Sequence, residues 1–130
     1  MITKYIRRYP FSLLLTAVIL CLSFFPVPHT QLDHVPFIDK WVHIVMYGGY
    51  TLVIWTEYLR SHIRIHFTRT LLLIVIVPIV MSGIIELLQE YCTVSRSGDW
   101  MDLAANTLGV VLSAIAGYTF LGSIVPHKRP

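Results

Sequence analysis

Charged residues are scarce in this chain. They make up 13% of its 130 residues, whereas 55% of the residues are hydrophobic. A soluble domain typically carries about 25% charged residues. The mean hydropathy is +0.68. This composition argues against a soluble domain and predicts one integral membrane domain that covers residues 1–130.

Sequence motifs of several enzyme classes are missing. The spacing of the two cysteines, Cys21 and Cys92, fits no redox or metal motif. The chain has no H-E-x-x-H segment and no serine in a glycine-framed nucleophile pattern. We therefore predict neither a metal nor another cofactor. The side chains best suited to hold a metal match no known ligand spacing: His43, Glu86, Asp99 and Asp102.

The chain does contain four apolar segments. Each is close to the roughly 20 residues that cross a bilayer. We expect membrane-spanning helices at about residues 9–27, 41–59, 70–91 and 100–121. Asp39 should lie near the N-terminus of the second helix, Asp99 should cap the fourth, and Pro78 should kink the third. The predicted fold class is an all-α integral membrane bundle of four transmembrane helices.

The charged residues sort by side of such a bundle. Only Lys40 and Arg96, of the ten basic residues, share one side with six of the seven acids, and Glu57 is the one acid on the other side. Loops rich in Lys and Arg face the cytoplasm. Both termini are therefore predicted to be cytoplasmic, in a multi-pass protein of a bacterial inner (plasma) membrane, and the basic charge requires no nucleic-acid partner. The basic residues on the cytoplasmic side are Lys4, Arg7, Arg8, Arg60, Arg64, Arg69, Lys128 and Arg129.

Polar side chains gather at the opposite, outward face. They come from the start of the second span, the end of the third, and the turn and start of the fourth. Ionisable groups at membrane depth are costly, so they indicate a function by default. The members of this cluster are Asp39, Lys40, His43, Glu86, Gln89, Glu90, Arg96, Asp99, Asp102 and Asn106.

Two interpretations of the cluster stay open. In the first it is a binding or catalytic site, in which His43, Glu86 and Asp102 are candidate acid/base groups. Arg96 would bind a phosphate or carboxylate. The other candidate ligand-binding residues are Asp39, Lys40, Gln89, Asp99 and Asn106. In the second interpretation the cluster is a structural network, in which Lys40 and Arg96 neutralise buried carboxylates.

The partners of these interpretations differ. A ligand of the outward site would arrive from the outer leaflet or the outside water, which fits a lipid-linked or cell-envelope molecule next to the lipid bilayer itself. The alternative is a non-enzymatic membrane scaffold or partner-binding module. Such a module would use the small residues Gly109, Ser113 and Gly117 as a helix interface. Whether a reaction is catalysed, and the oligomeric state, stay open.

Three motifs in the outward cluster resemble those of the VanZ-like family. They are DKWVHIVMYGGY (39–50), GIIELLQEY (83–91) and SRSGDWMDLAANTLGVVLS (95–113). The resemblance implies a small helical membrane protein of bacteria. The name-giving members of the family are associated with resistance to the glycopeptide teicoplanin, and most members have no established activity. The family's motif residues correspond here to Asp39, Lys40, His43, Glu86, Gln89, Arg96, Asp99, Asp102, Asn106 and Gly109.

Overall fold

The computed structural model describes residues 2–26, 31–61, 65–94 and 96–121. Within these residues the regular secondary structure is entirely helical, as the fold class predicts. The elements are α1 (Ile2–Arg8), α2 (Pro10–Phe24), η1 (Gln31–His34), α3 (Ile38–Ser61), α4 (Phe67–Thr70), η2 (Leu71–Ile76), α5 (Val77–Cys92), α6 (Trp100–Ala116) and η3 (Gly117–Leu121).

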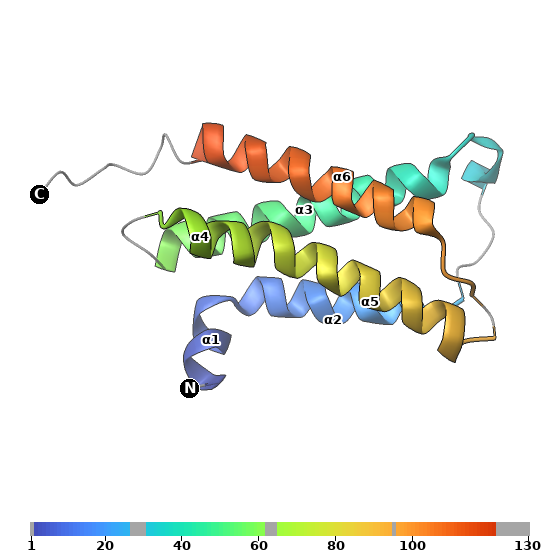
Figure 1. The fold of residues 1–130 in the computed structure, drawn as a ribbon, viewed down its shortest axis with the longest axis horizontal. Helices are drawn as coiled ribbons and strands as arrows, with labels where there is room; N and C mark the ends of the chain where they lie inside the picture. Colours follow the sequence, from blue (N-terminus) through green and yellow to red (C-terminus); the bar gives the residue numbers. More distant parts are fainter. Residues whose placement is uncertain (1, 27–30, 62–64, 95, 122–130) are drawn as a thin grey trace, which may run out of the picture.

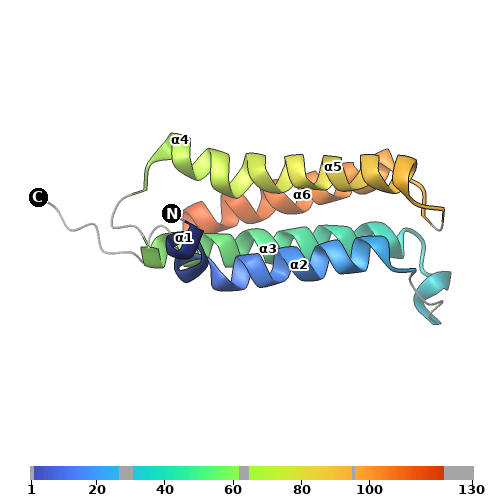
Figure 2. The same cartoon turned by 90° about the horizontal axis from the view of Figure 1, so that it is seen from below.

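The long helices lie side by side along one axis, and α1 turns away from this axis at one end (Figures 1 and 2). Helices α4, η2 and α5 form one continuous rod, as do α6 and η3. The expected segments therefore correspond to α2, α3, α4–α5 and α6–η3, with ends shifted by a few residues. Val27, which ends the first expected segment, lies outside the described residues.

Two of these rods are long and apolar enough to cross a membrane. Phe67–Cys92 has 26 residues and contains an 18-residue stretch with a mean hydropathy of 2.8; Trp100–Phe120 has 21 residues and contains an 18-residue stretch with a mean hydropathy of 1.5. Helix α2 is apolar but has only 15 residues. Helix α3 has 24 residues but carries polar and aromatic side chains along its packed face. The part of the chain that the structure describes thus contains two clear candidate spans, not four.

Pro78 coincides with a change in helix geometry. It is the second residue of α5, and the six residues of η2 that precede it form a π-helix. A proline ring lacks an N–H and clashes with the carbonyl four residues earlier, and the wider π turn gives that carbonyl room. The expected irregularity at Pro78 is therefore a widened turn inside a continuous rod.

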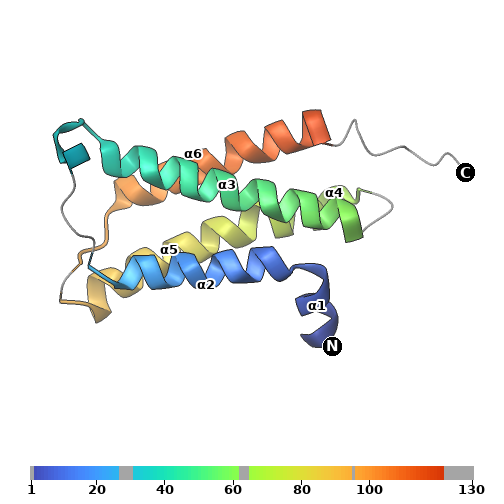
Figure 3. The same ribbon diagram turned by 180° about the vertical axis from the view of Figure 1, so that it is seen from behind.

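The bundle has two ends (Figures 1 and 3), and the residues at these ends differ in charge. We call one the polar end; it joins the C-termini of α2 and α5 to the N-termini of α3 and α6. We call the other the arginine end; it holds Arg8, Arg60 and Arg69. Arg64, Lys128 and Arg129, which are expected on the same side, lie outside the described residues.

Helices α3 and α6 make the most extensive contact in the bundle. A Cβ atom on Gly109 would collide with the backbone carbonyl of Ile44, and one on Gly48 would lie 2.9 Å from Ser113 Oγ. A Cβ atom on Gly117 would meet the Trp55 ring. The small-residue stripe of the α6–η3 rod is therefore covered by α3 of the same chain, so a partner helix cannot use it.

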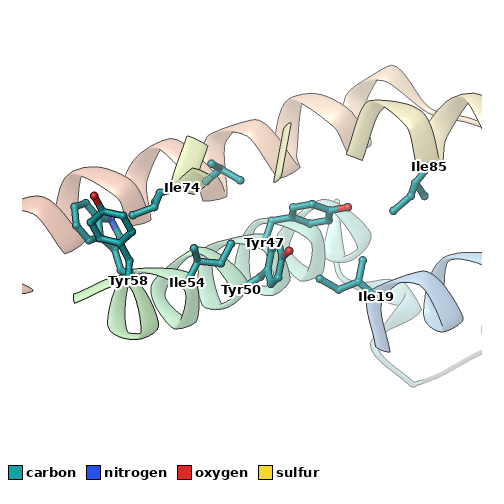
Figure 4. Close-up of a cluster of buried hydrophobic side chains, with 9 residues drawn as sticks. Ile19, Tyr47, Tyr50, Ile54, Tyr58, Ile74 and Ile85 are labelled. Carbon is teal, nitrogen blue, oxygen red and sulfur yellow. The ribbon is translucent and has the colours of Figure 1, made fainter. Parts of the chain in front are cut away.

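Aromatic residues of α3 fill the interior (Figure 4). The rings of Tyr47 and Tyr50 pack edge to face with centroids 6.4 Å apart. The Trp55 indole donates a hydrogen bond to the Ala114 carbonyl at 3.2 Å, which ties α3 to α6. The face that Tyr47 and Tyr50 share with His43 is thus the face that packs inward.

A buried glutamate holds the start of α2. Glu57 of α3 is only 3% exposed. Its carboxylate accepts hydrogen bonds from the Phe11 N–H at 2.8 Å, the Ser12 N–H at 3.0 Å and the Ser12 hydroxyl. The first N–H groups of a helix have no partner inside the helix, and a negative charge there suits the helix dipole. Glu57 therefore caps α2 from a neighbouring helix.

Candidate functional site

Lys40 is the centre of the polar end. Its ammonium donates hydrogen bonds to Asp99 Oδ2 and Asp102 Oδ1, both at 2.5 Å, and lies 2.9 Å from Asp39 Oδ2. Lys40 and Asp39 are in the first turn of α3, whereas Asp99 and Asp102 are at the start of α6. The ammonium therefore joins the starts of two helices.

Asp99 has a second task as the N-cap of α6. Its Oδ1 atom accepts a hydrogen bond from the Met101 N–H at 2.8 Å. A short acceptor side chain before the first helical turn is the usual way to satisfy such a group. This confirms the predicted cap and shows that both Asp99 oxygens are in use.

The charges around Lys40 stabilise one another. The hydrogen bonds from Lys40 hold the pKa of Asp39 and of Asp99 below its ordinary value. Burial alone would lower the pKa of Lys40, but the hydrogen bonds to Asp102 and Asp99 outweigh burial and raise it. The Lys40 ammonium and the carboxylates of Asp39 and Asp99 therefore stay charged across the neutral range.

One carboxylate oxygen each from Asp39, Asp99 and Asp102 lie within 4.8 Å of one another, an arrangement that could hold a cation. The Lys40 ammonium already contacts all three. A lysine in this place supplies the charge that a metal ion would otherwise supply. The three carboxylates therefore do not need a metal ion to offset their mutual repulsion.

His43 lies one turn further into α3 and faces two acceptors. Its Nδ1 atom lies 2.9 Å from Asn106 Oδ1, and its Nε2 atom lies 3.4 Å from Asp102 Oδ2. The Asn106 amide donates to Ser82 Oγ at 2.7 Å, which leaves Oδ1 as the acceptor for His43. Ser82 in turn hydrogen bonds to the Tyr47 hydroxyl. An imidazolium at His43 would have a partner for each N–H, so His43 and Asp102 form a potential proton-transfer pair.

Glu86 is buried on α5 but incompletely bonded. Its side chain is 4% exposed, and Oε2 accepts a hydrogen bond from the Asp99 N–H at 2.9 Å. Oε1 has no hydrogen-bond partner within the described chain. Glu86 lines a cavity of about 190 Å³ together with Glu90, Gly98, Asp99 and Trp100. The cavity thus presents carboxylate acceptors to anything that enters it.

Gly98 shapes the wall of this cavity. Its N–H donates to Glu90 Oε2 at 3.0 Å, and a Cβ atom at this position would collide with the Glu86 carbonyl. The turn can therefore approach α5 closely only because residue 98 has no side chain.

Gln89 and Arg96 belong to a separate contact. The Gln89 amide donates to the Ser23 carbonyl at 2.7 Å, and an Arg96 guanidinium nitrogen lies 3.0 Å from the Leu22 carbonyl. Both side chains satisfy the last carbonyls of α2, where a cation suits the helix dipole. The expected pairing of Arg96 with a carboxylate is not seen among the residues that the structure describes.

The structure thus brings together most of the predicted cluster, in three parts. Lys40 with three aspartates, His43 with Asn106, and Glu86 with Asp99 are direct neighbours. No hydrogen bond joins His43 to Glu86 in the described segments. Ser82 is a member that the sequence reasoning missed. It precedes Glu86 by four residues, so helical periodicity places both on one face of α5 and could have revealed it.

Comparison with known proteins gives one match. The family model described as VanZ/LLP1 matches residues 2–121, which is most of the chain. No curated protein and no solved structure matches the chain. The chain belongs to the VanZ/LLP1 family. Together with the two apolar rods, this indicates a membrane protein.

Proposed function

We propose that this VanZ/LLP1 protein crosses a bacterial plasma membrane four times, with both termini in the cytoplasm and the polar end facing outward. The separation of arginines from carboxylates supports this orientation, because positive charge is retained on the cytoplasmic side. The outward surfaces of the helices support insertion, since they are rich in exposed large apolar residues. On α2 these include Phe11, Leu13, Leu14 and Leu22.

We further propose that the polar end binds a cell-envelope or lipid-linked molecule at the Glu86 cavity. The observation that carries this proposal is the unbonded Glu86 oxygen beside a cavity. Glu86 Oε1 is not among the fully buried unpartnered atoms of the described chain, so it is an acceptor that opens toward the cavity and is available to a donor there. A hydroxyl or ammonium group of a ligand would supply that donor.

The size of the cavity limits what enters it. Pockets for whole small molecules span about 300–1,000 Å³, whereas this cavity holds about 190 Å³. It would therefore take a polar head or a few sugar hydroxyls, and the rest of the ligand would lie outside. Tyr91 and Trp100, which line the cavity, are 80% and 71% exposed. Such aromatic side chains favour the membrane–water interface, where a lipid-linked ligand would be held.

Arg96 supplies the complementary charge. Only one of its guanidinium nitrogens contacts the α2 carbonyls within the described chain. Its other guanidinium nitrogens have no hydrogen-bond partner among the described residues and could bind a phosphate, and the turn that carries Arg96 leads directly into Gly98 and Asp99 of the cavity. If a reaction follows binding, the His43–Asp102 pair is the nearest proton donor and acceptor. If the site acts on the cell envelope in this way, the protein would contribute to teicoplanin resistance, and teicoplanin susceptibility is the phenotype to measure.

The test is native purification followed by lipid analysis. Glu86→Gln keeps an acceptor for the Asp99 N–H but removes the charge, and Arg96→Ala removes the anion-binding group. We expect an envelope lipid that accompanies the parent protein to be lost from both variants while both still accumulate in the membrane. Arg60→Ala, at the other end, is the matched control. Identical lipid profiles in all four proteins would overturn the proposal.

The second candidate is a non-enzymatic module whose polar cluster is structural. The contacts of Lys40 with three aspartates favour it, because they need no ligand. Under this candidate, Asp102→Asn would accumulate poorly in the membrane, Glu86→Gln would accumulate with the lipid profile of the parent, and teicoplanin susceptibility would track protein level alone. Normal accumulation with lost lipid would reject it.

A further inference from the structure

A second cavity lies at the arginine end, far from the polar cluster. It encloses about 700 Å³ between the α1–α2 junction and α4. The residues that line it include Tyr5, Arg8, Tyr9, His66, Phe67 and Arg69. This volume is in the range of cavities that hold small-molecule ligands.

The cations of this cavity lack anions. Neither the Arg8 nor the Arg69 guanidinium has a carboxylate or hydrogen-bond partner among the described residues. Both arginines line the cavity together with Tyr9. The Glu57 carboxylate is engaged by three donors at the start of α2 and forms no ion pair with either arginine within the described chain.

The Tyr9 hydroxyl is a further polar group of this cavity that lacks a partner. It is buried from solvent and has no hydrogen-bond partner in the described chain. Buried polar atoms of this kind are uncommon and call for an explanation, such as a bound ion or ligand. Solvated arginines alone would explain Arg8 and Arg69 but not the unpaired Tyr9 hydroxyl in the same lining.

We propose that this cavity binds a phosphate diester of the kind an anionic phospholipid carries in its headgroup. Two guanidinium groups provide planar N–H pairs that match phosphate oxygens, and the covered Tyr9 hydroxyl would become a neutral donor when its side chain turns toward the ligand. Phe67 and Leu72, which line the same cavity, are 78% and 50% exposed and offer apolar surface for an acyl chain. In the proposed topology the cavity opens to the cytoplasmic leaflet, where anionic lipids meet basic sites.

The proposal is tested on the purified full chain by native mass spectrometry. The protein is equilibrated with phosphatidylcholine vesicles that contain phosphatidylglycerol, and retained phosphatidylglycerol is quantified. The pocket variant is Arg8→Gln/Arg69→Gln. The control is Arg7→Gln/Arg60→Gln, which removes the same charge from residues that do not line the cavity. We expect roughly tenfold or greater loss of retention in the pocket variant, and little change in the control.

Two further arms separate the outcomes. Tyr9→Phe removes only the unpaired hydroxyl, so it should weaken retention severalfold without lowering stability. Inorganic phosphate that displaces the lipid and binds equally well alone would identify a free phosphate site instead of a lipid site. Equal loss in the pocket and control variants, or retention unchanged by Tyr9→Phe and the pocket variant together, would overturn the proposal.

Discussion

Glu57 and Glu86 are two buried glutamates that each hold the start of a neighbouring helix. Glu57 reaches from α3 to α2 at the arginine end, and Glu86 reaches from α5 to α6 at the polar end. Their exposures, 3% and 4%, are nearly equal. Their hydrogen bonds differ in number: within the described segments Glu57 accepts from three donors, whereas Glu86 accepts from one.

This difference shows that the burial of a carboxylate does not by itself indicate a functional site. A saturated carboxylate such as Glu57 has nothing left to offer a ligand, and its role is to hold the fold. A carboxylate with a spare acceptor beside a cavity is available to a ligand. The cations of the two ends differ in a similar way. Lys40 at the polar end is paired with carboxylates, whereas Arg8 and Arg69 at the arginine end have no carboxylate partner among the described residues.

The comparison is tested most strongly by truncating each glutamate. Glu57→Ala leaves two backbone N–H groups and the Ser12 hydroxyl without acceptors, so we expect a loss of about 3–5 kcal/mol in the free energy of unfolding. Glu86→Ala leaves only the Asp99 N–H without an acceptor, so the expected loss in the free energy of unfolding is about 1–2 kcal/mol. Unfolding in detergent micelles, followed by tryptophan fluorescence, measures both. Equal losses would contradict the difference between the two sites.

Lys40→Met tests the cation at the polar end. The change leaves three aspartates close together without a positive charge. Breaking a buried pair costs about 3–5 kcal/mol, but Asp99 and Asp39 are 43% and 60% exposed, so solvent reduces the expected loss to about 1–3 kcal/mol. The same unfolding assay at neutral pH gives the value. Arg60→Met is the matched control and should change stability by less than about 0.5 kcal/mol.

The stability of the parent protein and that of Lys40→Met should change with pH in opposite directions. In the parent, Lys40 lowers the pKa of Asp39 and Asp99 in the folded state below the ordinary 3.8. Their contribution is therefore complete above that value and is lost as the pH falls through the folded-state pKa. In Lys40→Met the aspartates repel one another, so their protonation should stabilise the fold. Melting temperatures between pH 7 and pH 3 test this, and parallel curves would count against it.

The helices and their caps could be predicted from the sequence because they depend on local pattern. The apolar runs marked the long helices, and Asp99 before Trp100 marked a cap. Contacts that depend on how helices pack could not be predicted this way. Arg96 contacts the Leu22 carbonyl only because the turn after α5 lies at the end of α2. Glu57 gave no sign of its role, since a single acid on a basic side looks like an ordinary surface charge.

The smallest expected effect comes from the isosteric change at each glutamate. At Glu86 a glutamine carbonyl can still accept from the Asp99 N–H, and its NH₂ group can point into the cavity. The expected change in stability is within about 0.5 kcal/mol. At Glu57 both oxygens accept hydrogen bonds, so the NH₂ group of glutamine would face another donor, and the expected loss is about 1–3 kcal/mol. Unfolding of Glu86→Gln and Glu57→Gln in parallel measures this difference. A stability loss at Glu86→Gln as large as that at Glu57→Gln would mean that Oε1 is already bonded, and the cavity would then have no spare acceptor for a ligand.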